Sequence, residues 1–207
     1  MSQQEFETLV VQDQSPVLRV MLNRPKLANA MNLKMVNELM AVMEKVECEN
    51  YRVLIISGGN GNFCAGGDIK DMQSAGADKQ ALIELNRAFG HLITKADHLP
   101  CAVICALEGA VLGGGFGLAC VSDLAIAVEK TQFGLPETSL GIIPAQIAPF
   151  VVQRIGLTQT RRLALFGNRI KAQEAMSLGL IHQVVEDTEQ LEGAVTKAIK
   201  LALKCAP

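Results

Sequence analysis

Two glycine-rich segments are the first residues whose types and spacing point to chemistry. They are FCAGGDI, residues 63–69, and LGGGFGLA, residues 112–119, and both lie near apolar runs. Glycine lets a backbone approach a ligand closely, and the first turn of a helix offers N–H groups without intrahelical partners. Two such turns that converge can hold an oxygen atom that gains negative charge. Tight packing at two ordinary turns explains the same glycines equally well.

A carboxylate in a largely apolar segment is the next candidate. Glu137 lies in FGLPETSLGIIP, residues 133–144, directly after Pro136. A carboxyl group with few polar neighbours has a raised pKa, which suits proton transfer. Proline followed by an acid is also ordinary chemistry for the first turn of a helix. For this segment taken alone, the structural interpretation is the stronger one.

Sequence motifs for several other chemistries are absent. Neither glycine-rich segment contains G-x-x-x-x-G-K-[ST] or G-x-G-x-x-G, and the chain has no G-x-S-x-G. The six cysteines include no C-x-x-C pair and the three histidines form no ligand-like cluster, so we expect no metal site. A net charge of −2 argues against nucleic acid as a partner.

The location of the protein is also predicted from its composition. The first ten residues, MSQQEFETLV, are polar and acidic and predict no signal peptide. The longest apolar stretch, residues 99–120, contains Glu108 and a glycine triplet, which predicts buried core and no membrane contact. Cysteines placed in apolar runs fit a reducing compartment. We therefore expect a cytoplasmic protein.

Alternating strands and helices are expected to position the candidate residues. Hydrophobic periodicity predicts strands at 5–12, 16–22, 52–57, 102–107, 123–128 and 181–185. It predicts helices from an Asn32 cap to Glu47 and at 79–96, 113–120, 158–166, 172–178 and 189–204. This alternation predicts an α/β fold with parallel strands. The last helix has an apolar stripe that predicts a covering surface, here supplied by assembly: Leu191, Ala194, Val195, Ala198, Ile199 and Ala202.

Four segments together resemble the successive signature blocks of the crotonase (enoyl-CoA hydratase/isomerase) superfamily. They are LNRPKLANAMN (22–32), FCAGGDIKDM (63–72), GAVLGGGFGLACVSDLAIA (109–127) and TQFGLPETSLGIIP (131–144). The resemblance implies a spiral of ββα units over residues 1–190 and, at 191–207, the start of a shortened helical C-terminal region. It also implies a homotrimer or a dimer of trimers. The implied partner is an acyl-CoA substrate, with no separate cofactor because coenzyme A is part of that substrate.

The resemblance also assigns roles to individual residues. Gly67 and Gly114 match the two backbone donors of an oxyanion hole, and Glu137 matches a catalytic glutamate. Positions that match contacts to the substrate and its coenzyme A are Lys26, Ala30, Ala65, Gly67, Asp68, Ile69, Lys70 and Gly114. Chemistry beside a thioester carbonyl passes through an enolate, and each donor to its oxygen is worth roughly 3–4 kcal/mol.

Two positions depart from the pattern of typical hydratases. Gly117 stands where a second glutamate is usual, and residues 144–150 read PAQIAPF where P-G-x-G-G-T is usual. The second departure resembles hydratases of branched glutaconyl-CoA thioesters, whereas a single glutamate resembles enoyl-CoA isomerases. The leading interpretation is a lyase that hydrates an α,β-unsaturated acyl-CoA. The alternatives are a double-bond isomerase that uses Glu137 alone and a non-catalytic acyl-CoA-binding scaffold.

Overall fold

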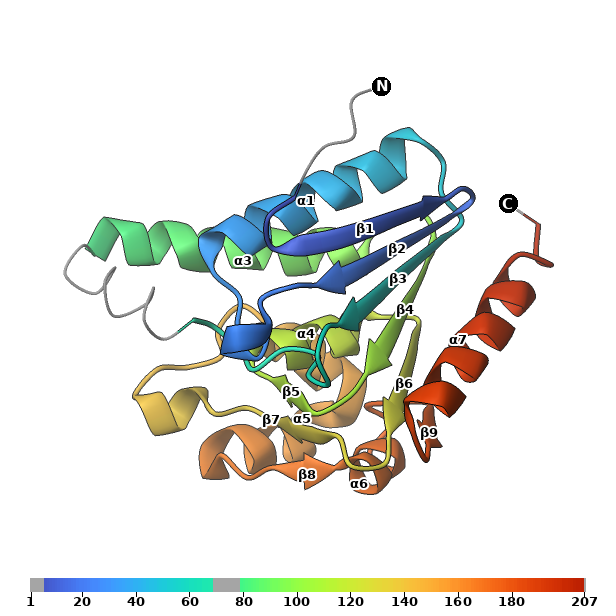
Figure 1. Cartoon of the computed structure of the whole chain (residues 1–207). Helices are drawn as coiled ribbons and strands as arrows, with labels where there is room; N and C mark the ends of the chain where they lie inside the picture. Colours follow the sequence, from blue (N-terminus) through green and yellow to red (C-terminus); the bar gives the residue numbers. More distant parts are fainter. Residues whose placement is uncertain (1–5, 69–78, 207) are drawn as a thin grey trace.

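A six-stranded sheet forms the frame of the molecule (Figure 1). The computed structural model describes residues 6–68 and 79–206. The strand order is β1-β2-β3-β4-β6-β9, with β1 antiparallel to β2 and every other neighbouring pair parallel. The strands are β1 (Leu9–Gln14), β2 (Val17–Leu22), β3 (Val53–Gly58), β4 (Ala102–Leu107), β6 (Leu124–Val128) and β9 (Gln183–Val185). The predicted α/β fold with mostly parallel pairing is confirmed.

A second, smaller sheet lies where the glycine-rich segments come together. It consists of β5 (Ala110–Leu112), β7 (Gln132–Gly134) and β8 (Ile170–Lys171), with β5 parallel to β7 and β7 antiparallel to β8. Both of its parallel strands lead into candidate residues: β5 ends just before Gly114, and β7 ends just before Glu137. The sheet thus brings two distant segments to the same place. Its strands of two or three residues are too short for a periodicity signal, and the sequence did not predict them.

Helices cover the sheets and carry most of the remaining chain. They are α1 (Leu33–Cys48), α3 (Lys79–Asp97), α4 (Gly114–Val121), α5 (Ala148–Phe166), α6 (Ala172–Ser177) and α7 (Thr188–Ala202), with the short 3₁₀ helices η1 (Pro25–Leu27) and η2 (Glu137–Leu140). The predicted cap of α1 is confirmed, because the Asn32 side chain accepts a hydrogen bond from the Met35 N–H at 3.0 Å. α5 begins well before the predicted residue 158. Gly156, with φ 78°, interrupts it and hides its first half from a periodicity argument.

The two faces of the large sheet pack against different helices. In β3, Leu54 and Ile56 belong to the main core with α1, whereas Val53 and Ile55 belong to a second cluster with α7. This follows from the two-residue alternation of side chains along a strand. A strand buried on both faces reads as the continuous apolar run found in the sequence. Figure 1 shows α1 and α7 on opposite sides of this sheet.

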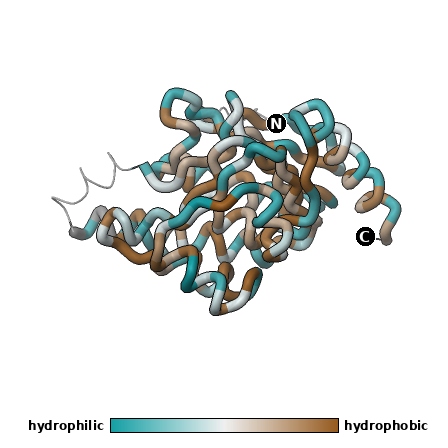
Figure 2. Tube along the Cα trace, turned by 90° about the horizontal axis from the view of Figure 1, so that it is seen from below, coloured by the Kyte–Doolittle hydropathy of each residue, from teal (hydrophilic) through white to brown (hydrophobic). Residues whose placement is uncertain are grey.

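The apolar stripe of α7 corrects one expectation. Leu191, Ala194 and Val195 are buried against the large sheet of the same chain, in the cluster that contains Ile104 and Ile126. The first half of the stripe is therefore covered within the chain and gives no support to assembly, which stays a prediction. Figure 2 shows hydrophobic and hydrophilic residues mixed along this last segment, as an amphipathic helix requires. The expected boundary after residue 190 falls inside α7, and the division into domains stays a prediction.

Candidate active site

A cavity of about 360 Å³ brings the chemical candidates together. Gly67, Gly114 and Glu137 all line it, and so does Ala65. The other walls are mostly apolar side chains from α3, from β5, from η2 and from the segment after η2: Leu85, Phe89, Leu112, Leu140, Ile142, Ile143 and Ile147. Among the described lining residues, Glu137 is the one acid and Arg169 the one base. Such a cavity suits an apolar ligand that is oriented by a few polar groups.

The backbone around Gly67 is held by a short parallel bridge to Met31. The Met31 N–H donates to the Gly66 carbonyl at 2.8 Å, and the Asp68 N–H donates to the Met31 carbonyl at 2.9 Å. Because N–H and C=O groups alternate in direction along an extended chain, the Gly67 N–H points away from Met31. It donates to no group in the described part of the chain. The amide lies fixed between two anchored neighbours and is available to a ligand.

The second amide lies at the start of α4. Gly114 is the first residue of the helix, so its N–H has no intrahelical acceptor. The Gly113 N–H donates to the Gly134 carbonyl at 3.1 Å, whereas the Gly114 N–H donates to no described group. A Cβ atom added to Gly114 would lie 2.7 Å from the Phe89 ring. Glycine at this position therefore lets the aromatic ring cover the backbone closely.

The Glu137 carboxylate lies close to Gly113, the residue before Gly114. A Cβ atom built on Gly113 would be 2.9 Å from Glu137 Oε1 and 3.4 Å from the Gly66 Cα. Glu137 Oε2 is buried and has no hydrogen-bond partner among the described residues. A buried polar atom without a partner is rare in proteins and calls for a functional explanation. The geometry thus favours a ligand-directed carboxylate over the capping role that the sequence segment alone suggested.

The protonation of Glu137 follows from its surroundings. Burial penalises the charged carboxylate and raises its pKa above the ordinary value. A hydrogen bond from its own backbone N–H acts in the opposite direction but has the smaller effect. A carboxyl group whose pKa is moved toward neutrality can both accept and return a proton. This is the electrostatic environment expected of a general acid–base group.

The structure also shows what occupies the side-chain space at Gly117. A Cβ atom added there would lie 2.4 Å from Cγ2 and 3.1 Å from Cβ of Ile147. Ile147 is 2 % exposed and comes from the PAQIAPF segment, so the two sequence departures are in direct contact. The next residue back, Gln146, is placed in the same way against Gly90 of α3. The segment 144–147 is thus seated in notches left by two glycines, and no side chain fits at position 117.

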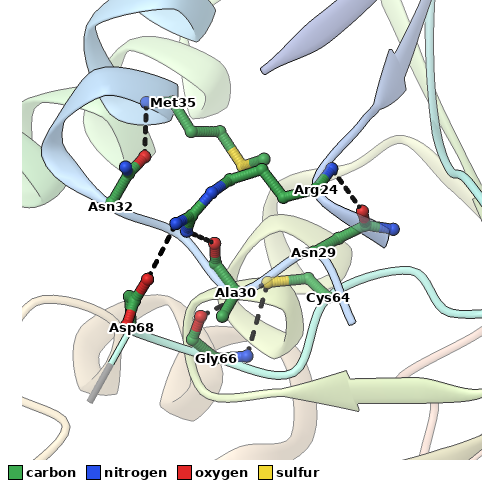
Figure 3. A network of polar contacts seen from close by, with 8 residues as sticks. All are labelled: Arg24, Asn29, Ala30, Asn32, Met35, Cys64, Gly66 and Asp68. Atoms are coloured by element: carbon green, nitrogen blue, oxygen red, sulfur yellow. Dashed lines mark hydrogen bonds and ion pairs between the residues drawn. The ribbon is translucent and has the colours of Figure 1, made fainter. Parts of the chain in front are cut away.

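A buried ion pair joins the first two sequence blocks (Figure 3). The Arg24 guanidinium lies 2.8 Å from Asp68 Oδ2 and donates to the Ala30 carbonyl at 2.5 Å. The Asn29 side chain accepts a hydrogen bond from the Arg24 backbone N–H at 2.8 Å and donates one to the Asn62 backbone carbonyl at 2.7 Å. Asp68 is 5 % exposed, so this ion pair fixes the chain at the residue directly after Gly67. Neither Arg24 nor Asn29 was predicted from the sequence, because Asp68 and Asn62, which they contact, lie far along the chain.

The other predicted coenzyme A positions are spread around the cavity. Ala65 lines it, and its N–H donates to the Ala28 carbonyl at 3.0 Å. Lys26 is exposed on η1, and Ala30 is buried beside the ion pair. Ile69 and Lys70 lie outside the described residues. The structure therefore brings Ala65, Gly67 and Gly114 to one cavity, and places Lys26, Ala30 and Asp68 on the segments that flank it.

The described residues contain neither a metal-binding cluster nor a membrane-spanning helix. Between residues 6–68 and 79–206, no group of three or more His, Cys, Asp or Glu side chains could hold a metal ion. Within the same ranges, every helix is too short or too polar to span a bilayer.

Comparison with known proteins gives a consistent result over nearly the whole chain. A model of the family described as enoyl-CoA hydratase/isomerase matches residues 12–206. The structure of Pseudomonas aeruginosa AtuE is similar with a TM-score of 0.94 and 54% identity, over 97% of this chain and 79% of that one. An enoyl-CoA hydratase/isomerase from Marinobacter aquaeolei has a TM-score of 0.92 and 52% identity, over 97% and 78%. The 2,3-dehydroadipyl-CoA hydratase of Escherichia coli strain K12 is 34% identical over 199 residues, 94% of this chain and 75% of that protein.

Proposed function

This chain belongs to the enoyl-CoA hydratase/isomerase family, with the crotonase fold and the general activity of an acyl-CoA hydratase or isomerase, and from that premise we propose that it hydrates an α,β-unsaturated acyl-CoA. One observation carries the proposal. A buried carboxylate oxygen of Glu137 that has no partner among the described residues lies in the same cavity as the Gly67 and Gly114 amides. An acid–base group and two backbone donors are the parts that enolate chemistry needs.

The proposed reaction uses each part once. The Gly67 and Gly114 N–H groups bind the thioester carbonyl oxygen, which becomes the enolate oxygen. Glu137 removes a proton from water as the water oxygen bonds to the β-carbon, and the protonated carboxyl then gives a proton to the α-carbon. The sum is the addition of one water molecule across the double bond, and Glu137 returns to its starting state. Coenzyme A enters as part of the substrate, and we expect no separate cofactor.

The proposed coenzyme A site lies along the first two sequence blocks. Lys26, Ala30, Ala65 and Asp68 lie on the segments that flank the Gly67 side of the cavity. Lys26 would meet phosphate groups, since it is an exposed cation. Ile69 and Lys70, which lie outside the described residues, belong to the same proposal.

A double-bond isomerase is the second candidate, and the contact between Gly117 and Ile147 favours it. Because that contact leaves no room for a second carboxylate, one acid must do all the proton transfer. In an isomerase, Glu137 would remove a proton from one carbon of the acyl chain and return it to another, without consuming water. A non-catalytic acyl-CoA-binding scaffold is the remaining alternative.

The deciding experiment is an assay of the purified protein with a panel of acyl-CoAs. Loss of the absorbance of an unsaturated thioester, with formation of the 3-hydroxyacyl product, supports the hydratase. Shift of the double bond without uptake of water supports the isomerase. Binding without either reaction supports the scaffold.

The acyl group is a finer part of the proposal. We propose a branched glutaconyl-CoA, whose acyl chain ends in a carboxylate. Arg169 supports this, because it lines the cavity and its guanidinium donates to the neutral Gln132 side chain at 3.3 Å, with no ion pair to a carboxylate of the described residues. If Arg169 binds the substrate carboxylate, Arg169→Met raises KM for carboxylated substrates and leaves KM for crotonyl-CoA unchanged. An equal change for both substrates contradicts this assignment.

Assembly and location also remain proposals. We propose a homotrimer or a dimer of trimers in the cytoplasm. Support comes from exposed apolar side chains on the segments around η2 and the end of α5: Leu140, Ile143, Leu165 and Phe166. Ile143 and Phe166 are 75% and 74% exposed, and the Thr138 hydroxyl of η2 donates to the Ala164 carbonyl of α5 at 2.6 Å, so the two segments are neighbours. Exposed apolar side chains gathered on neighbouring segments commonly mark an interface. Light scattering decides the question, because a stable monomer at micromolar concentration contradicts the proposal.

A further inference from the structure

Cys64 lies directly against the segment that carries the first proposed donor, Gly67. It is fully buried, and its thiol contacts the residue that precedes Gly67 (Figure 3). The Gly66 N–H donates to the Cys64 sulfur at 3.4 Å, and the sulfur lies 3.6 Å from the Gly66 carbonyl oxygen. The thiol therefore meets both backbone groups of the residue next to one proposed donor.

The same side chain supports the second amide. A Cβ atom added to Gly115 would lie 2.7 Å from the Cβ of Cys64 and 3.3 Å from its sulfur. Gly115 directly follows Gly114, so Cys64 touches the residue before one proposed donor and the residue after the other. One small side chain thus contacts the backbone on both sides of the proposed oxyanion hole.

The backbone of Cys64 is fixed in the same direction. Its N–H donates to the Ala110 carbonyl at 2.8 Å, and its carbonyl accepts from the Leu112 N–H at 2.9 Å. These bonds form a short parallel bridge to β5, which leads directly to Gly113 and Gly114. The two loops are thus joined by backbone bonds on one side and by the thiol on the other.

We propose that the Cys64 side chain is a positioning residue that sets the separation of the Gly67 and Gly114 amides. The inference rests on the proposed oxyanion hole and adds the residue that spaces its donors. Small displacements of such groups cost much of their effect, because donors stabilise the enolate oxygen only at hydrogen-bond distance. Thiol size and its weak donor and acceptor capacity are the properties that matter.

The test compares two ligands that differ in the oxygen bound by the amides. Acetoacetyl-CoA forms a stable enolate, whereas S-butyl-CoA is a thioether without a carbonyl oxygen. The ratio of their dissociation constants measures the contribution of the amides, and a general loss of stability does not change it. In Cys64→Ala we expect this preference for acetoacetyl-CoA, and kcat, to fall on the order of tenfold.

Three further variants make the test specific. Cys64→Ser keeps a small donor and acceptor at the site and should retain the preference within about threefold. Cys105→Ala removes another fully buried thiol, whose sulfur contacts the Leu118 carbonyl and neither Gly66 nor Gly115, and should leave the ratio unchanged. Gly115→Ala places a methyl group against the Cys64 side chain, from the segment that carries Gly114. It should lower the ratio even if Cys64→Ala does not fold.

The outcomes separate this inference from the proposed function. A wild-type protein that binds acetoacetyl-CoA no better than S-butyl-CoA contradicts the oxyanion hole itself. A wild-type preference that is unchanged in folded Cys64→Ala, or lowered equally in Cys105→Ala, overturns the role of Cys64. If the preference for acetoacetyl-CoA falls in Cys64→Ala or Gly115→Ala and is retained in Cys64→Ser, the role of Cys64 is supported.

Discussion

Gly114 and Gly117 lie three residues apart on α4, and glycine serves a different purpose at each position. At Gly114 the missing side chain lets the Phe89 ring lie close to the backbone, and the helix N-terminus leaves an amide free for a ligand. At Gly117 the missing side chain makes room for Ile147, which closes the interior. The start of this short helix is thus open to chemistry, and its middle is filled by packing. The comparison teaches that a glycine in a site must be interpreted through its neighbour.

The largest expected effect tests the open end of the helix. Glu137→Gln keeps the size of the side chain and removes its ability to move a proton. We expect acyl-CoA binding to be retained and turnover to fall at least on the order of 10²-fold, the usual scale of general acid–base catalysis. Steady-state kinetics with a binding titration measures both. Loss of binding together with turnover would restore the capping interpretation, and unchanged turnover would assign the proton to another group.

The next effect tests the packing of Ile147 against Gly117 in the middle of the helix. Gly117→Ala places a methyl group where Ile147 now lies, and overpacking of this kind costs about 2 kcal/mol of unfolding free energy. Urea denaturation measures this cost in the wild-type background and in Ile147→Ala. Because the contact is direct, the cost should be smaller in the second background. Equal costs in the two backgrounds would show that Ile147 is not what excludes a side chain from position 117.

A smaller effect concerns pH and the protonation of Glu137. Burial raises the pKa of Glu137 in the folded state, so the charged form is disfavoured by folding. The associated stability is present below the unfolded pKa and is lost as pH rises through the folded pKa. Glu137→Gln should therefore be slightly more stable than wild type at neutral pH, with the difference disappearing in acid. Thermal melts across this range check the sign, and kcat/KM of the wild type should rise with pH over the same interval.

The smallest effect is predicted at the second glycine notch. A Cβ atom added to Gly90 would lie 2.1 Å from Gln146 Oε1, which is the far end of a flexible side chain. Gln146 can turn away, and alanine is favoured over glycine inside a helix by roughly 0.5–1 kcal/mol. Gly90→Ala should thus change the unfolding free energy by less than about 0.5 kcal/mol. A cost like that of Gly117→Ala would show that the whole segment 144–147 is held rigidly.

The sequence predicted the parts that depend on local pattern or on matched motifs. The buried strands near residues 53–57 and 102–107 and the Asn32 cap are confirmed, and the segments around Gly67, Gly114 and Glu137 line one cavity. The capping and ligand-directed interpretations of Glu137 could not be separated from the sequence, because burial of Oε2 depends on distant residues. The contact of Ile147 with Gly117 was missed for the same reason. Both departures were visible, but only the fold shows that they touch.

The burial of Cys64 has a consequence for the chemical durability of the protein. Unsaturated thioesters are electrophiles that alkylate thiolates, and it is the thiolate form of cysteine that reacts. Burial raises the pKa of Cys64 to about 11, so this sulfur, beside the proposed enolate site, stays a neutral thiol at physiological pH. Cys48 and Cys205 are the exposed cysteines of the described chain. An electrophilic substrate therefore meets an unreactive sulfur in the segment that holds its own carbonyl.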